Sequence, residues 1–111
     1  MADKIKLVQG DTFPTVRLTL TDPVTGNAIY LADSTTTVQV YFRKAGSTTV
    51  LSTIPCTKVS GGATGQVQFN FASGVLDVDP GAYEGEIEIN FDGQIQTVYE
   101  LLKFSVRQQF S

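Results

Sequence analysis

Apolar residues recur at every second position in four short runs of this chain. Their apolar members are Val16, Leu18 and Leu20; Val38, Val40 and Phe42; Val67, Phe69 and Phe71; and Ile87, Ile89 and Phe91. Alternate side chains of an extended strand point to opposite faces, so each run buries one face and leaves the other in water. No longer stretch has the period of about 3.6 residues that an amphipathic helix needs. The sequence therefore predicts an all-β protein.

Turn-forming residues separate the predicted strands. The dipeptide Asp92-Gly93 lies between two such runs, and both residue types tolerate the positive φ of a type I′ turn, so it predicts a hairpin. Pro55 predicts an edge strand or a break, because proline cannot donate a hydrogen bond to a neighbouring strand. In the last segment the apolar phase changes from Ile95 and Tyr99 to the even-numbered positions that follow. A bulge near 100–101 would explain that change.

About seven to eight short antiparallel strands in 111 residues are typical of a β-sandwich with a single core, so we expect residues 1–111 to form one domain. Asp79, Gly81 and Tyr83 have the spacing of the tyrosine corner, in which a tyrosine hydroxyl bonds to upstream backbone, and this resembles immunoglobulin-like sandwiches. Gly85 stands where antibody domains have their second cysteine, and the chain has no tryptophan. The expected fold is thus an antiparallel immunoglobulin-like β-sandwich without the antibody disulfide.

The residue inventory argues against an enzyme. The chain contains no histidine, and its one cysteine, Cys56, has no base to activate it, so we expect a small buried side chain there. We predict no catalytic residue and no cofactor. The formal net charge of -3 disfavours binding to nucleic acid. The first six residues contain no apolar signal segment and no run is long enough to span a membrane, so we expect a protein made and kept in a cytosol.

Acidic residues from Asp77 to Glu88 suggest a calcium site, but their spacing does not support one. Glu84, Glu86 and Glu88 would form a line along a strand, with neighbours about 7 Å apart, rather than a cage around an ion. We therefore predict no metal site.

Charge is segregated along the chain. Seven acids and no base lie between Val59 and Leu102, whereas the rest of the chain has eight bases and four acids. One interpretation is a solvated strand face. The other is an interface in which acidic residues of one copy meet basic residues of a neighbour. The candidate interface residues are Glu84, Glu86, Glu88, Arg17, Arg43 and Lys44. Three tyrosines, at positions 30, 41 and 99, suggest either a platform for sugars or ordinary packing.

Several segments together resemble the N-terminal domain of phage baseplate upper proteins. They are Leu7-Val8-Gln9-Gly10-Asp11-Thr12-Phe13-Pro14; Leu18-Thr19-Leu20-Thr21-Asp22 with Thr25-Gly26; Val40-Tyr41-Phe42-Arg43; Gly65-Gln66-Val67; Gly81-Ala82-Tyr83; and Asp92-Gly93. The resemblance extends from about Leu7 to Val106 and rests on turn and core residues.

This resemblance implies a non-catalytic virion protein of a tailed bacteriophage, made in the host cytoplasm and docked in the tail or baseplate. Its expected partners are other phage virion proteins and further copies of itself. The longer proteins continue into a linker and a receptor-facing region, whereas this sequence ends at Ser111, so a docking or adaptor role is expected rather than receptor binding. The alternatives are a capsid decoration or head-fibre protein, and a carbohydrate-binding module that contacts the host surface.

Overall fold

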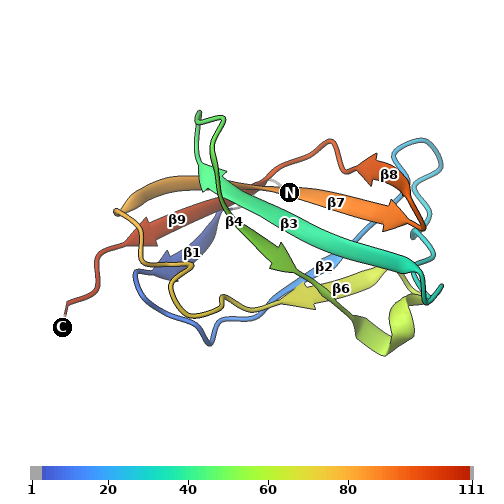
Figure 1. Cartoon of the computed structure of the whole chain (residues 1–111), viewed down its shortest axis with the longest axis horizontal. Helices are drawn as coiled ribbons and strands as arrows, with labels where there is room; N and C mark the ends of the chain where they lie inside the picture. Colours follow the sequence, from blue (N-terminus) through green and yellow to red (C-terminus); the bar gives the residue numbers. More distant parts are fainter. Residues whose placement is uncertain (1–3, 111) are drawn as a thin grey trace.

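Nine β-strands in two sheets are the main elements of the computed structural model, which describes residues 4–110 (Figure 1). The larger sheet contains six strands. Five follow one another in the order β1 (Ile5–Val8), β9 (Leu102–Arg107), β7 (Gly81–Phe91), β3 (Thr36–Lys44) and β4 (Val50–Pro55), and β8 (Gln94–Thr97) pairs with β7. The smaller sheet has the order β2 (Val16–Thr19), β6 (Gln66–Phe69) and β5 (Thr57–Lys58), and a 3₁₀ turn, η1 (Val59–Gly62), connects β5 to β6. The all-β prediction is confirmed.

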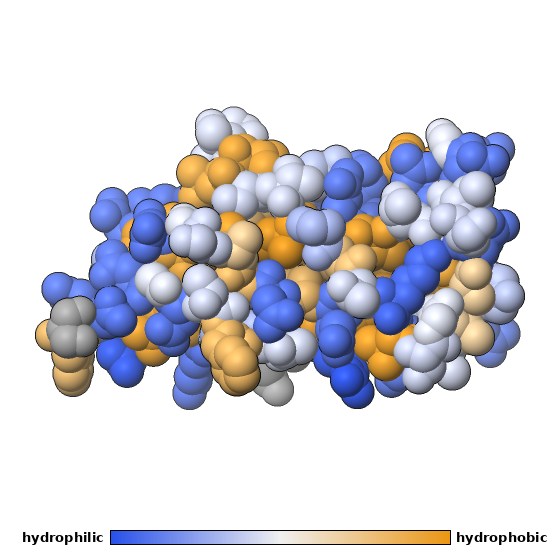
Figure 2. Space-filling model, turned by 60° about the horizontal axis from the view of Figure 1, so that its bottom comes forward, coloured by the Kyte–Doolittle hydropathy of each residue, from blue (hydrophilic) through white to orange (hydrophobic). Residues whose placement is uncertain are grey.

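The two sheets enclose one hydrophobic core, to which each predicted run contributes its apolar face. Buried positions alternate with more exposed ones along β3, from Val38 to Phe42, and along the second half of β7. Phe42 lies at the centre, with its ring stacked on Tyr83 at 5.2 Å and edge-on to Phe104 at 5.4 Å. Figure 2 shows hydrophilic residues over much of the face in view, with hydrophobic ones between them. The alternation in the sequence thus becomes an inner and an outer face of each sheet.

The order of the strands is that of an immunoglobulin-like sandwich. In chain order, β3, β7 and β9 take the places of strands C, F and G, and β2, β5 and β6 those of strands B, D and E. Strand β1 extends the larger sheet by pairing with β9. This pair is parallel, with Ile5 opposite Phe104 and Val8 opposite Arg107. The expectation of purely antiparallel pairing is wrong at this one place.

Nine strands are present in the described residues, where seven to eight were expected. The number is higher because two of the predicted strand segments are each divided into two strands. Pro55 ends β4, which is an edge strand as predicted, and β5 then joins the other sheet. The second break separates β8 from β9.

The hairpin predicted at Asp92-Gly93 is confirmed. Phe91 pairs with Gln94 across it, and the φ angles of Asp92 and Gly93 are 52° and 99°. A type I′ turn requires positive φ at both central residues.

The predicted change of phase in the last segment is wrong. Ile95 and Tyr99 lie outside the core, with 54% and 93% of their surface exposed, whereas Leu102 and Phe104 are buried. Even-numbered side chains therefore point inward before and after the break. Glu88 of β7 pairs with Thr97, and Gly85 of β7 pairs with Leu102. These two positions are three residues apart in β7 and five residues apart in the partner segment. The break between β8 and β9 adds an even number of residues to the partner segment. Side chains after the break therefore point to the same face of the sheet as those before it.

Candidate functional site

The tyrosine corner connects the start of β7 to the loop before it. Tyr83 is 3% exposed, and its hydroxyl donates a hydrogen bond of 2.6 Å to the backbone carbonyl of Asp79. Burial raises the pKa of the Tyr83 phenol. Gly81 has a φ of 149°, which an L-residue with a side chain rarely adopts. These contacts attach the loop to the core, and this part of the molecule has a structural role.

The three glutamates of the candidate interface lie on the outer face of β7, but residues of neighbouring strands already bind two of them, Glu84 and Glu88. Glu84 accepts a hydrogen bond of 2.9 Å from Lys103 on β9, and Arg43 on β3 lies 3.4 Å away on the other side. The hydrogen bond from Lys103, together with the charges of Lys103 and Arg43, lowers the pKa of the Glu84 carboxyl, although its burial acts in the opposite direction. Only 12% of the Glu84 side chain is exposed. Arg43 and Glu84 therefore meet within one chain, whereas the sequence suggested a contact between copies.

Glu88 is also engaged within the chain. Its carboxylate accepts hydrogen bonds from the Tyr41 hydroxyl and from the Gln39 amide, both 3.0 Å long. The hydrogen bond to Glu88 raises the pKa of Tyr41, because the neutral phenol is the form that donates. The row of glutamates is thus largely built into the outer face of the larger sheet.

The six candidate interface residues do not form one surface. Arg17 belongs to β2 in the smaller sheet, where its guanidinium donates to Gln68 on β6. Lys44 is exposed at the end of β3. Glu86 borders a shallow hollow on the larger sheet, with Arg43, Lys103 and Tyr99. Contacts of these residues with another copy remain a prediction, and Glu86 and Lys44 are the members best placed to make them.

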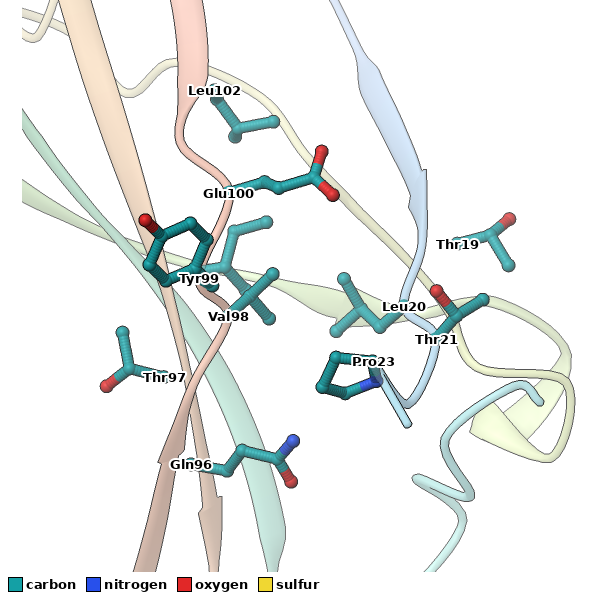
Figure 3. Close-up of a pocket in the computed structure, with 11 residues that line it drawn as sticks. Thr19, Leu20, Thr21, Pro23, Gln96, Thr97, Val98, Tyr99, Glu100 and Leu102 are labelled. Carbon is teal, nitrogen blue, oxygen red and sulfur yellow. The ribbon is translucent and has the colours of Figure 1, made fainter. Parts of the chain in front are cut away.

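An apolar groove lies between the two sheets, where the sandwich is open along one side (Figure 3). Its volume is about 420 Å³. One wall comes from the end of β2 and the residues after it, and the other from β8 and the break before β9. The lining residues are Thr19, Leu20, Thr21, Pro23, Ile87, Gln96, Thr97, Val98, Tyr99, Glu100 and Leu102.

Side chains alternate along the second wall of the groove. In Figure 3, Gln96, Val98 and Glu100 point toward β2, whereas Thr97 and Tyr99 point away. Sequence reasoning assigned Tyr99 to packing or to a sugar platform and did not detect the groove. No local pattern in the sequence indicates the groove, because its two walls are far apart in the chain and meet only in the fold.

Described residues offer no metal site and no helix that could cross a membrane. Within 4–110, no three histidine, cysteine, aspartate or glutamate side chains are grouped closely enough to hold a metal ion. The same residues contain no helix that is long and apolar enough to span a bilayer.

Cys56 is partly buried beside the core. Burial raises the pKa of its thiol to about 12, because a thiolate is poorly solvated there. Since the thiolate is the reactive form, Cys56 is poorly suited to act as a nucleophile at neutral pH.

No family model matches the chain, and no curated protein is significantly similar to it. The geometry above is therefore the basis for assigning a function.

Proposed function

We propose that this chain is a non-enzymatic structural protein of a tailed-phage virion, with a docking or adaptor role in the tail or baseplate. The observation that carries the proposal is the immunoglobulin-like strand order. The motifs behind the resemblance to baseplate upper proteins also lie where they build this fold. Gly81 and Tyr83 form the tyrosine corner, and Asp92-Gly93 forms the hairpin turn.

A fold does not by itself define a function, so the proposal also depends on the surfaces that the fold presents. On the larger sheet, Glu84 is paired with Arg43 and Lys103, and Glu88 accepts hydrogen bonds from Tyr41 and Gln39. The groove between the sheets is lined mostly by apolar and uncharged residues. Such a surface is better suited to binding other proteins than to catalysing a reaction.

The experiment is to locate the protein in phage particles. Particles purified from the source strain would be analysed by mass spectrometry, and immunogold labelling would show where the protein lies. We expect a fixed number of copies per particle, with label at the tail or its tip. Label over the capsid would instead support the decoration or head-fibre alternative, and absence from particles that contain other tail proteins would refute a virion role.

A second candidate, a carbohydrate-binding module, is favoured by Tyr99. Its side chain is 93% exposed beside the shallow hollow, about 700 Å³ in volume, that Arg43, Glu86 and Lys103 help to line. An exposed ring can stack on a sugar, and charged side chains can bind hydroxyl groups. This function predicts glycan binding that is lost in Tyr99→Ala and kept in Tyr30→Ala, whose tyrosine is also exposed. No glycan binding by the wild-type protein would eliminate it.

A further inference from the structure

The turn between β7 and β8 contains the one Asp-Gly dipeptide of the chain, Asp92-Gly93. Both residues are exposed, and no atom outside the adjacent residues lies within 4 Å of the place where a side chain of Gly93 would begin. An aspartate side chain reacts with the backbone nitrogen of the next residue most readily when that residue is glycine, because no side chain hinders the approach. The turn therefore combines a reactive dipeptide with an open position on the surface.

The reaction converts aspartate to isoaspartate in two steps. The backbone nitrogen of Gly93 forms a bond to Cγ of Asp92, the nitrogen loses its proton, and a carboxyl oxygen leaves as water, so that a succinimide ring closes. Water then opens the ring. Opening at the backbone carbonyl of Asp92 leaves the chain running through Cβ and Cγ, which is isoaspartate. One water is released and one is taken up, so no further reactant is needed.

Two features of the folded turn slow ring closure. The N–H of Gly93 donates a hydrogen bond of 2.7 Å to Oδ1 of Asn90, and this bond favours the amide that still carries its proton. Ring closure also rotates ψ of Asp92 away from the value of about +30° that a type I′ turn requires. The pairing of Phe91 with Gln94 holds the turn in that conformation. Reaction therefore depends on opening of the hairpin.

Strand β8 is held in place by this turn. Within the described residues it pairs only with β7, and three of its four residues are exposed. The length of a hairpin loop fixes the register of its strands, and isoaspartate adds one carbon to the backbone of a two-residue loop. The register of β8 on β7 would then be lost, whereas β7 would keep its pairing with β3.

We propose that Asp92 is a site of spontaneous isoaspartate formation, that the Asn90 side chain slows the reaction while the hairpin is closed, and that the product releases β8 from the larger sheet. The rate then reports how often β8 detaches, because local opening precedes ring closure. Release of β8 also removes one wall of the groove between the sheets. This inference concerns the chemistry of the isolated protein and does not depend on the proposed function.

The test is to age the purified protein at neutral pH for several weeks. An isoaspartyl methyltransferase assay would quantify the product, and mass spectrometry with electron-transfer fragmentation would assign it to residue 92. We expect measurable conversion in the folded wild type, and conversion at least about tenfold faster in urea, where the hairpin is lost. Asp92→Glu should give no product, because its longer side chain would have to close a less favourable ring.

Substitutions at Asn90 test the role of its side chain. Asn90→Ala should raise the rate in the folded protein about fivefold, which is the effect of losing one ordinary hydrogen bond. Asn90→Asp keeps an acceptor for the N–H of Gly93 and should stay near the wild-type rate. The matched control is Ile95→Ala, because Ile95 lies opposite Asn90 and takes no part in that hydrogen bond. Equal rates in Asn90→Ala and Ile95→Ala would overturn the role of Asn90.

The modified protein tests the structural consequence. After chromatographic separation of the isoaspartate form, amide hydrogen exchange should be faster in β8 than in the unmodified protein and unchanged in β3. Unchanged exchange in β8, equal rates of conversion in the folded protein and in urea, or no isoaspartate in the folded wild type would each overturn the inference. The location of the protein in particles is measured independently, so none of these results decides the proposed function.

Discussion

Tyr83 is a single side chain that fixes a connection between two parts of the chain. Its ring stacks on Phe42 in the core while its hydroxyl holds the backbone of Asp79. We expect Tyr83→Phe to lower the free energy of unfolding by about 1–2 kcal/mol, because a partly buried carbonyl loses its partner. Urea denaturation would measure the loss. Tyr99→Phe is the control, because its ring is exposed and its change should stay within about 0.5 kcal/mol. An equal effect of the two substitutions would argue against a corner that stabilises the fold.

Cys56 provides a test of burial through reactivity. With a thiol pKa near 12, very little thiolate is present at neutral pH, so modification of the folded protein by a thiol reagent should be slow. The same reaction in urea should be much faster, since unfolding restores an ordinary thiol pKa near 8.5. Cys56→Ala should fold and cost only packing energy. Equal labelling rates in the folded and unfolded protein would show that the thiol is more open than the structure indicates.

Across the larger sheet, three neighbouring strands are linked by Glu84, which lies between Arg43 and Lys103. We expect Glu84→Gln to destabilise the protein by about 1 kcal/mol at pH 7, a modest value because both basic partners are partly exposed. Glu86→Gln, on the same face of the same strand, is the control and should cost less. Denaturant unfolding of both variants and the wild type would measure the difference.

The pH dependence of this effect has a definite sign. Contacts with Lys103 and Arg43 lower the pKa of Glu84 in the folded protein. The resulting stabilisation is therefore present above the unfolded carboxyl pKa, which is about 4.3, and disappears as the pH falls through the lower folded value. The difference in stability between wild type and Glu84→Gln should shrink from pH 7 to pH 3. A difference that stays constant over this range would contradict the assignment.

Local patterns in the sequence predicted elements well and their pairing poorly. Alternation identified the strands, and Asp92-Gly93 identified a hairpin, because both depend on residues close together in the chain. The pairing of β3 with β7 brings Arg43 beside Glu84, 41 residues away, and no local pattern contains that register.

The groove could not be predicted from the sequence for the same reason. Its walls come from the end of β2 and from β8 with the residues that follow it, which lie far apart in the sequence. Ile95 and Tyr99 were also misassigned, because hydrophobicity alone does not distinguish an exposed apolar residue from a core one.

At the scale of the molecule, one core connects both sheets. Buried residues from Leu7 to Val106 belong to a single cluster. We expect one cooperative unfolding transition in urea, since neither sheet can keep its apolar face buried without the other. Far-ultraviolet circular dichroism reports the strands, and near-ultraviolet circular dichroism reports the packed aromatic rings. Their transitions should coincide, whereas separate midpoints would show that one sheet survives alone.

The parallel pairing of β1 with β9 determines how the molecule carries mechanical load. Force applied outward at the start of β1 and at the end of β9 pulls two adjacent parallel strands in opposite directions along their length. The pairs from Ile5 opposite Phe104 to Val8 opposite Arg107 are then sheared together, so their hydrogen bonds must break at once and not one after another. Pulling across the same strands, from β1 to β4 at the far edge of the sheet, would instead open them in sequence. The sandwich therefore resists force best along the length of these two strands, between the start of β1 and the end of β9.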